Sequence, residues 1–432
     1  MTTPIWYNLA LFLIKPFYKW RIKKRATNSE QYQTECLERF GPFQPALNTA
    51  TIWFHAVSVG ETNAAQPLIE HYLTLGHAVL VTNTTTTGQA RSQALFAKDE
   101  YAGLFQAVYL PADQKQIVRA FFTQYQPKIL LLVETELWPN LLDQATQFAV
   151  PSLLINARLS EKSAQAYAKV SSLTAPMLQC LSQILAQDQA TQQRFNDLGA
   201  DLNKNKVVGS IKYDIQAPIG LAEQKLKLLQ NWQLAKRKII TIASTHAPEE
   251  QKILALLKPL LDQHRDYVCI VVPRHPERFD AIFNLCQSLK LDTQRRSLGQ
   301  KIEVDTQVYL ADSMGELWLW YALSQVCFVG GSLNEPGGGH NILEPLVLNV
   351  ATVIGPNYFN FQSIVDEFLN SKAILLGQDA QQVVQQLQAC IEDPALAEQL
   401  NTDAQHVLMR NRGSLQRHID VIDRYLMDVT EG

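Results

Sequence analysis

Short apolar runs recur along the chain after Pro45, and each is followed by a stretch long enough for a helix. The first series lies at 51–57, 78–82, 107–110, 129–133, 152–155, 184–186 and 206–208. Buried parallel strands read as continuous apolar runs and need helical crossovers between them. The alternation therefore predicts a doubly wound parallel sheet, with helices such as 62–75 and 113–125 between its strands.

The same alternation starts again after a polar stretch rich in Lys and Gln at 216–237. The second series of runs lies at 238–243, 267–273, 308–311, 326–331, 351–355 and 373–377. Two α/β units in tandem are the simplest interpretation, and a chain of 432 residues also favours two domains.

The predicted division is an N-terminal segment at 1–45, a first domain at 46–220 and a second domain at 221–432. Near the C-terminus, apolar residues recur at helical spacing. We expect them to form one face of a helix that packs on one of the two units, the first domain being one choice. They are Leu415, Ile419, Ile422 and Leu426.

The N-terminal segment is apolar from Ile5 to Ile14, except for Asn8, and then becomes aromatic and basic. A secretory signal peptide has the opposite order, and a membrane-spanning helix needs about 20 apolar residues. The pattern favours an element that lies on the cytoplasmic leaflet of a membrane. A helix packed on the protein's own body and a short tilted span are the alternatives. The later residues are Lys15, Phe17, Tyr18, Lys19, Trp20, Arg21, Lys23, Lys24 and Arg25.

The net charge, the cysteine spacing and the search for metal-ligand motifs argue against several classes of partner and site. A formal net charge of -3 gives no reason to expect nucleic acid as a partner. The six cysteines are scattered without a CxxC pair, which fits neither a disulfide framework nor a zinc site and points to a reducing compartment. No HExxH, DxD or clustered His/Cys spacing indicates a metal.

Candidate chemistry in the first unit follows the ends of predicted strands, where open α/β sheets bind ligands. HAVSVGE places Glu61 near a helix start, where it either caps the helix or acts as a general base. ETELWPN places Glu134 and Glu136 after a buried strand, where they serve the chemistry or bind local backbone. GSIKYD places Lys212 after a short strand, facing the cleft or simply solvated.

In the second unit, ASTHAPEE predicts a strand-to-helix turn, and PRHPER places cations after a strand, where they can meet a phosphate or carboxylate. SMGEL and the loop GGSLNEPGGGHNILEP follow later. The glycines allow close backbone approach, and a helix start at NILEP would offer N–H groups to an anion. Glu344 there suits a ribose diol, whereas a flexible turn is the alternative. Neither GxGxxG nor a P-loop is present.

Together, HAVSVGE, ETELWPN, INARLS, GSIKYD, STHAPEE, PRHPER, MGEL and GGHNILEP resemble the 3-deoxy-D-manno-octulosonic acid (Kdo) transferases of lipopolysaccharide synthesis. The motifs occur in the family's order over nearly the whole chain, and the N-terminal segment is similar to the family's membrane anchor. One difference is the longer EPGGGHN segment between Ser332 and His340, which leaves that loop's contacts open.

The resemblance implies a GT-B architecture, with two Rossmann-like domains facing across a cleft. It implies CMP-Kdo as donor, a lipid A precursor (lipid IVA) as acceptor, no cofactor, and a place on the cytoplasmic face of the inner membrane. Glu61 would be the proton acceptor, and Glu134 and Lys212 would stabilise the transition state. The residues implied to contact CMP are Pro273, Arg274, Met314, Gly315, Glu316, Asn341, Ile342, Leu343 and Glu344.

We expect an inverting, direct displacement in which the Gly337–Asn341 turn, the helix N-terminus after it and Lys212 supply positive charge, so that no metal is needed. One alternative is a sugar-nucleotide 2-epimerase, which would not need the apolar-basic N-terminus. A catalytically idle membrane scaffold would not need Glu61, Glu134 and Lys212. A dinucleotide oxidoreductase lacks its glycine fingerprint.

Overall fold

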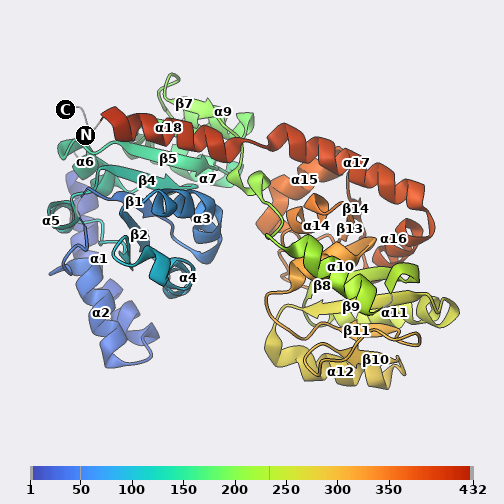
Figure 1. The fold of residues 1–432 in the computed structure, drawn as a ribbon. Helices are drawn as coiled ribbons and strands as arrows, with labels where there is room; N and C mark the ends of the chain where they lie inside the picture. Colours follow the sequence, from blue (N-terminus) through green and yellow to red (C-terminus); the bar gives the residue numbers. More distant parts are fainter. Residues whose placement is uncertain (1–2, 49, 233, 429–432) are drawn as a thin grey trace. The chain divides into compact units, whose positions relative to one another are not determined.

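The computed structural model describes residues 3–48, 50–232 and 234–428, and its contacts divide the chain into two compact units (Figure 1). The first unit contains the described residues up to Asp214 and those from Arg412 onward. The second contains Ile215–Asn411. Each unit has its own parallel sheet and its own hydrophobic core.

The sheet of the first unit has the strand order β3-β2-β1-β4-β5-β6-β7. β1 is central, and its Trp53 is paired with Leu80 on one side and Leu130 on the other. The order reverses between β1 and β4, and ligands of open α/β sheets bind at such a point. The strands are β1 Ile52–His55, β2 Val79–Asn83, β3 Phe105–Tyr109, β4 Ile129–Val133, β5 Ser152–Ala157, β6 Gln183–Ala186 and β7 Asn205–Val207.

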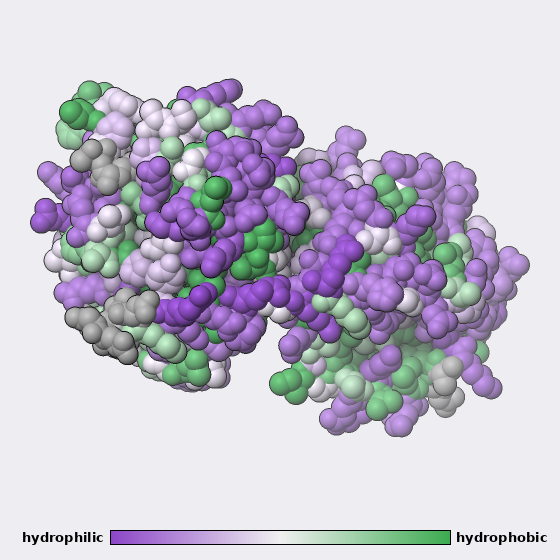
Figure 2. Space-filling view, turned by 90° about the horizontal axis from the view of Figure 1, so that it is seen from above, coloured by the Kyte–Doolittle hydropathy of each residue, from purple (hydrophilic) through white to green (hydrophobic). Residues whose placement is uncertain are grey.

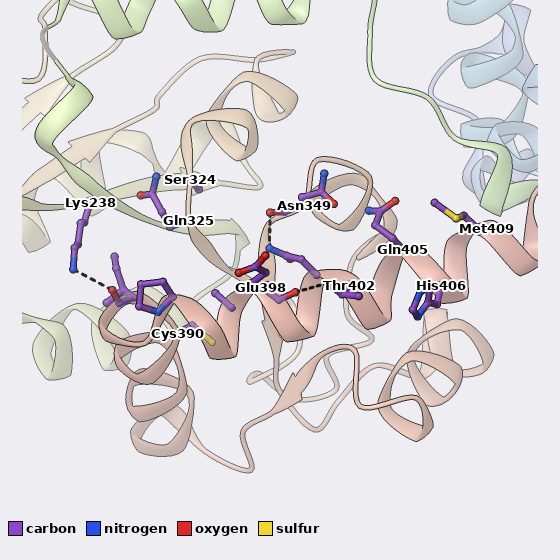
Figure 3. A pocket seen from close by; sticks show the side chains of 14 residues that line it. Lys238, Ser324, Gln325, Asn349, Cys390, Glu398, Thr402, Gln405, His406 and Met409 are labelled. Atoms are coloured by element: carbon purple, nitrogen blue, oxygen red, sulfur yellow. Dashed lines mark hydrogen bonds between the residues drawn. The ribbon is translucent and has the colours of Figure 1, made fainter.

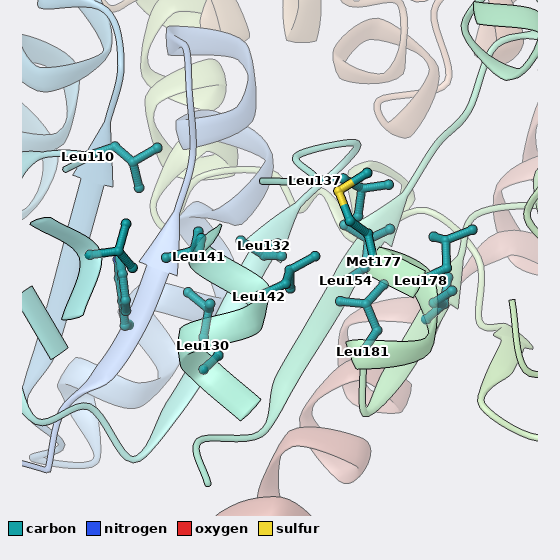
Figure 4. Close-up of a cluster of buried hydrophobic side chains, with 14 of the residues drawn as sticks. Leu110, Leu130, Leu132, Leu137, Leu141, Leu142, Leu154, Met177, Leu178 and Leu181 are labelled. Carbon is teal, nitrogen blue, oxygen red and sulfur yellow. The ribbon is translucent and has the colours of Figure 1, made fainter. Parts of the chain in front are cut away.

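Helices cover both faces of this sheet, which is why its strands are apolar throughout. Leu130 and Leu132 of β4 pack on one face with residues of α5, α6 and α8 (Figure 4). Leu131, on the opposite face, packs with α3 and α18. The helices are α1 Ile5–Arg25, α2 Ser29–Phe40, α3 Val59–Thr74, α4 Thr86–Phe96, α5 Lys115–Tyr125, α6 Pro139–Gln147, α7 Glu161–Ala168, α8 Ser171–Cys180, α9 Gln189–Asp197 and α18 Ser414–Asp428, with the short turns η1 Asp99–Tyr101 and η2 Ile211–Asp214.

The second sheet has the order β10-β11-β9-β8-β12-β13-β14, and it is also parallel. Here β8 is central, and the order reverses between β8 and β12. The strands are β8 Lys238–Thr245, β9 Tyr267–Pro273, β10 Thr293–Arg295, β11 Val308–Leu310, β12 Val326–Val329, β13 Ala351–Ile354 and β14 Leu375–Leu376.

The helices of the second unit cover both faces of its sheet. They are α10 Leu221–Asn231, α11 Glu249–Gln263, α12 Phe279–Ser288, α13 Leu317–Leu323, α14 Leu343–Val347, α15 Gln362–Asn370, α16 Ala380–Glu392 and α17 Pro394–Asn411, with the turns η3 Leu234–Lys236, η4 Pro276–Arg278 and η5 Phe359–Phe361.

Two features depart from the sequence patterns. The apolar runs predict the strands of both sheets except β10, whose three polar residues pair with β11 at the sheet edge. The C-terminal helix α18 lies within the range 221–432 expected for the second domain, but it belongs to the first unit, which was one of the two placements expected for it. Its Ile419 and Ile422 are buried in that unit's core because they complete the apolar layer against α3 and β4.

The helix α1 is docked on the first unit through polar contacts. Tyr7 donates a hydrogen bond to Asp113 at 2.8 Å, and Asn140 donates one to Asn8 at 3.0 Å. Large apolar side chains along the same helix are 53–87% exposed: Ile5, Trp6, Leu9, Phe12, Leu13, Ile14, Phe17 and Trp20. Within the described ranges, no helix combines the length and apolarity needed to cross a bilayer.

Hydrophilic side chains dominate the face of the molecule seen in Figure 2, where hydrophobic ones form smaller patches. On a typical soluble surface single apolar residues are scattered. The run of exposed apolar side chains along α1 differs from this, because many of them lie on one helix.

Candidate active site

Glu61 lies on the first turn of α3, directly after the central strand β1. It accepts a hydrogen bond from the Val57 N–H at 2.6 Å, and Ser58 is the N-cap of the helix. The helix-capping interpretation therefore describes its geometry. Burial, together with the charges of Glu136 and Glu134, nevertheless raises the pKa of Glu61 to about 8, against the opposing bond from Val57. A carboxyl group that titrates near neutral pH is suited to taking up a proton.

Glu134 and Lys212 form an ion pair in the same unit. Lys212 Nζ lies 3.1 Å from Glu134 Oε1, and the two side chains are 25% and 21% exposed. Glu134 follows β4 with a φ of 62°, a left-handed conformation that costs a non-glycine residue about 1–3 kcal/mol. Its N–H donates to the Ile155 carbonyl at 3.0 Å, which holds the turn in place. The fold thus joins two of the expected catalytic residues that are far apart in sequence.

The turn η2 that carries Lys212 is held by the C-terminal segment. Asp214 accepts hydrogen bonds from Gly413 N at 2.7 Å and Leu415 N at 2.6 Å. Asn156 accepts one from Ile211 N at 3.2 Å and donates its own N–H to His418. Burial lowers the pKa of His418 to about 4, so its ring is neutral and able to accept that bond. The position of Lys212 therefore depends on the C-terminal segment, which lies outside all the motifs found in the sequence.

Glu136 is a further member of this acidic cluster, which sequence reasoning left out of the site residues. Its Oε2 accepts a hydrogen bond from Trp138 Nε1 at 3.0 Å and lies 3.8 Å from His55 Nε2. His55 is buried, and its other ring nitrogen is 3.0 Å from the Thr82 carbonyl. The proximity of Glu136 to Glu61 is visible only in the fold, because it results from the pairing of β1 with β4.

In the second unit, Pro273 ends β9 and Arg274 follows it. The Arg274 N–H donates to the Thr245 carbonyl at 3.1 Å, whereas its side chain is exposed and has no ion-pair or hydrogen-bond partner in the described part of the chain. Arg278 differs, because both of its terminal nitrogens bind buried Glu250, at 2.6 and 3.1 Å. Of these two arginines, Arg274 is the one available to an anion.

The segment Met314–Glu316 precedes α13. Glu316 makes a two-pronged ion pair with Arg296, at 2.6 and 3.0 Å, and accepts a hydrogen bond from Ser313. These contacts, led by the bond from Arg296, hold the pKa of Glu316 below its usual range. Met314 is 60% exposed, and Gly315 has a φ of 83° that suits glycine. The segment therefore offers a ligand its backbone and Met314 more readily than the Glu316 carboxylate.

The glycine-rich loop after β12 is fixed from inside by Glu249. This fully buried carboxylate accepts hydrogen bonds from His246 N at 2.9 Å, Gly331 N at 2.8 Å, Ser332 N at 3.0 Å and Leu333 N at 2.8 Å. Burial raises the pKa of Glu249, but four donors saturate the acceptor sites of the ionised form, so the carboxylate is the form that fits. Sequence reasoning saw Glu249 only as a helix-start residue.

The same loop uses two further amides within the fold. Gly338 N donates to the Asn357 carbonyl at 3.1 Å, and Gly339 N donates to the Gly331 carbonyl at 2.8 Å. Protein acceptors therefore occupy the N–H groups of these two glycines, so neither group is available to an anion. Among the described residues of the loop, the N–H groups of Asn334, Glu335 and Gly337 have no acceptor, and neither do the three consecutive N–H groups of 340–342, which directly precede α14.

The segment 341–344 contributes through backbone and polar atoms. Ile342 and Leu343 are 0% and 1% exposed, so their side chains belong to the core. Asn341 donates to Glu344 Oε1 at 3.2 Å and accepts from Leu343 N at 3.1 Å. Burial raises the pKa of Glu344 to about 7, and it outweighs the hydrogen bond from Asn341 and the charge of Arg274, which both act to lower the pKa. The expected helix start exists, but α14 has only five residues.

A separate cavity of about 700 Å³ lies in the second unit, away from these residues (Figure 3). Its lining includes Lys238, Gln325 and Asn349, which stand at or just before the starts of β8, β12 and β13. The cavity is therefore at the amino edge of the sheet, opposite the candidate site. Across the described residues, no group of three or more His, Cys, Asp or Glu is arranged to hold a metal ion.

Comparison with solved structures identifies the fold. A UDP-N-acetylglucosamine 2-epimerase from Listeria monocytogenes has a TM-score of 0.56 at 10% sequence identity, covering 88% of this chain and 98% of that one. At this identity the likeness shows the fold alone. Two Rossmann-like units of this kind define the GT-B class, to which many glycosyltransferases belong.

Sequence relatives give the family. The family model for 3-deoxy-D-manno-octulosonic-acid transferase matches residues 34–215. A 3-deoxy-D-manno-octulosonic acid transferase from Haemophilus influenzae is 35% identical over 97% of this chain and 98% of its own length. The chain belongs to the Kdo transferase family, and it is a glycosyltransferase of lipopolysaccharide biosynthesis.

A crystal structure of the C-terminal CMP-Kdo binding domain of WaaA from Acinetobacter baumannii also matches. It is 65% identical in sequence, covers 44% of this chain and 99% of that one, and has a TM-score of 0.44.

Proposed function

We propose that the protein transfers Kdo from CMP-Kdo to a glucosamine hydroxyl of a lipid A precursor (lipid IVA), with inversion at the anomeric carbon and Glu61 as general base. The observation that carries the proposal is the cluster of Glu61, Glu134 and Lys212 at the carboxyl ends of β1 and β4 and on η2. The family supplies the class of reaction, and the cluster supplies a group able to accept a proton.

In the proposed step, the Glu61 carboxylate removes the proton of the acceptor hydroxyl. The hydroxyl oxygen forms a bond to the anomeric carbon of Kdo, and the bond from that carbon to the phosphate oxygen breaks, so that CMP leaves. Because the pKa of Glu61 is raised to about 8, its ionised form is a stronger base than an ordinary glutamate. The same shift makes the step faster as the pH rises toward 8.

The Glu134–Lys212 pair is proposed to stabilise the transition state. As the sugar gains oxocarbenium character and negative charge grows on the leaving phosphate, a fixed cation and a fixed carboxylate can stabilise the opposite charges. The pair is only partly exposed and is anchored through Asn156 and Asp214, so little reorganisation is needed.

On the donor side, we propose that CMP binds the second unit at Pro273 and Arg274, at Met314, Gly315 and Glu316, and at Asn341, Ile342, Leu343 and Glu344. The exposed Arg274 guanidinium and the N–H groups of 340–342 suit the phosphate. Glu344 suits a ribose hydroxyl. Ile342 and Leu343 would act through their backbone, because their side chains are buried.

We propose that α1 places the protein on the cytoplasmic face of the inner membrane. Its exposed aromatic and aliphatic side chains would enter the lipid interface, and its basic residues would meet anionic headgroups. Co-sedimentation with phosphatidylglycerol vesicles tests this. We expect binding that drops when Phe12 and Leu13 are both replaced by Asp, and equal binding by both proteins would contradict the role of α1.

The decisive experiment for the reaction uses the purified full chain with CMP-Kdo and the tetraacylated lipid A precursor. Mass spectrometry should show an acceptor heavier by one or more Kdo residues, and NMR should show the inverted anomeric configuration. If CMP-Kdo is not consumed while a UDP-sugar is epimerised, the 2-epimerase alternative replaces the proposal.

A further inference from the structure

Two histidines from different loops meet at the carboxyl edge of the second sheet. His246 follows β8 and His340 belongs to the glycine-rich loop, and their Nε2 atoms are 2.8 Å apart. The two rings are nearly parallel, at 10°. Gly331 lies against both rings, and a Cβ there would come within 3.0 Å of His340. The glycine is therefore needed for the two rings to approach each other.

The surroundings of the pair are cationic on one side and acidic on the other. His275 and Arg274, after β9, face both rings, and Arg278 faces His246. Glu250 on α11 faces His246, and Glu249 binds the His246 N–H. Glu250 is already paired with Arg278, and Glu249 is saturated by four N–H groups, so neither carboxylate is left to neutralise the histidines. Burial, then the neighbouring His246, Arg274 and His275, lowers the pKa of His340 to about 4; burial also lowers that of His246.

The geometry limits the pair to one extra proton. A hydrogen bond between two Nε2 atoms requires one of them to carry the hydrogen. In the neutral pair the ring that donates has an unprotonated Nδ1, whereas the accepting ring has an Nδ1–H. One added proton turns the unprotonated Nδ1 into a donor, so both rings then present an N–H. A second added proton would place two N–H groups against each other. The pair therefore titrates as a unit.

Neither Nδ1 atom has a hydrogen-bond partner within the described residues, and neither atom is fully buried. The exposed Arg274 guanidinium and the N–H groups of 340–342 lie in the same cluster of loops, and they are also without partners there. An anion between these groups would meet the N–H donors of the backbone and of Arg274. It would also meet the two Nδ1 atoms, of which one is a donor in the neutral pair and both are donors after one proton is added.

We propose that His246 and His340 form a proton-sharing pair that binds the anionic phosphodiester of the donor nucleotide and takes up one proton from solvent as it does so. The proposal rests on the proposed function and adds two donor-binding residues to it. The negative charge of the ligand favours the charged pair, and the charged pair offers the ligand two additional donors. Donor affinity is therefore linked to pH through the second unit, independently of Glu61.

The test uses the full-length protein and the methyl phosphodiester of cytidine 5′-monophosphate. This probe has a single negative charge that does not titrate near neutral pH, so protons taken up belong to the protein. Isothermal titration calorimetry between pH 5.5 and 8, in buffers of different ionisation enthalpy, gives the number of protons taken up for each ligand bound. We expect the number of protons taken up to approach one in part of that range. There the association constant should fall by up to tenfold for each unit by which the pH rises.

His340→Gln and His246→Gln should each bind the probe more weakly at low pH and take up fewer than about 0.2 protons, as the linkage disappears. His406→Gln, an exposed histidine on α17 in the same unit, is the matched control and should behave as the parent. Unfolding temperatures of all variants establish that the folds are intact.

Three results would overturn the proposal. The first is binding of the probe by the parent protein without proton uptake, which leaves the donor assignment standing and makes the pair structural. The second is undiminished uptake in both glutamine variants, which places the proton elsewhere. The third is the absence of any binding, which removes the proposed donor site together with the pair.

Discussion

Glu61 and Glu249 occupy corresponding places in the two units. Each lies on the first turn of the helix that follows the central strand of its sheet, α3 after β1 and α11 after β8. Glu249 is fully buried and accepts four backbone N–H groups. Glu61 accepts one backbone N–H, and its pKa is raised first by burial and then by the neighbouring charges of Glu136 and Glu134.

The difference teaches how one position in a fold serves two purposes. A carboxylate whose acceptor sites are all used stabilises a loop and has nothing left for a ligand. A carboxylate with one strong donor and acidic neighbours is poised to exchange a proton near neutral pH. The number of donors around the group, rather than its place in the sequence, separates the structural glutamate from the proposed catalytic one.

The largest expected effect belongs to Glu61→Gln. A positioned base typically contributes ~10²–10⁴-fold, so turnover should fall by about that factor while CMP binding stays unchanged. Transfer rates and calorimetric CMP binding measure the two quantities. Glu70→Gln on the same helix is the control. Ordinary turnover in Glu61→Gln would remove Glu61 from the proposed mechanism.

The same variant tests the raised pKa through stability. The folded-state pKa of about 8 lies above the unfolded value, so protonated Glu61 favours the folded state at low pH, and this contribution is lost as pH rises through 8. Glu61→Gln lacks this dependence. Its melting temperature should therefore rise relative to the parent between pH 6 and pH 9, and a constant difference would contradict the shift.

Glu249→Gln should act on stability rather than chemistry. The amide group would turn donors toward backbone N–H groups and leave some of them unpaired, which costs about 2–3 kcal/mol. Urea unfolding should show the loss in the transition of the second unit. Glu398→Gln, an exposed glutamate of α17, is the control. Full stability in Glu249→Gln would show that the loop is held by other contacts.

Lys212→Met should lower turnover by about tenfold to hundredfold, because the fixed cation beside the developing negative charge is lost. Lys206→Met, an exposed lysine on β7, provides the comparison. If Lys212 and Glu134 act together, the double variant with Glu134→Gln should lose less than the product of the two single losses. Independent losses would mean that the ion pair is not the functional unit.

The smallest effect is expected for Glu136→Gln. Removing this negative charge should lower the pKa of Glu61, so the rise of kcat/KM with pH should begin at lower pH while the plateau changes little. A pH series from 6 to 9.5 measures the shift, with Glu161→Gln on exposed α7 as the reference. If the rise of kcat/KM instead began at a higher pH in Glu136→Gln, the proposed effect of the Glu136 charge on Glu61 would be contradicted.

The sequence alone determined the two tandem sheets and most of the candidate residues. Strands buried on both faces must be continuously apolar, so runs such as 129–133 show themselves without knowledge of the fold. Ligands of open α/β sheets bind at the ends of such strands, which is why the candidates Glu61, Glu134 and Arg274 could be chosen from the sequence. The motifs in order then indicated the family, which sequence relatives confirm.

The tertiary structure decided which groups meet and which are already used. Lys212 reaches Glu134 because η2 is tied to α18, a contact between segments that share no local pattern. The Gly331 N–H donates to Glu249 and the Gly338 N–H donates to the Asn357 carbonyl, and no sequence pattern indicated either bond. The hydrophobic pattern of the sequence indicates which residues are buried. Hydrogen-bond partners and pKa values depend instead on neighbours that only the folded chain brings together.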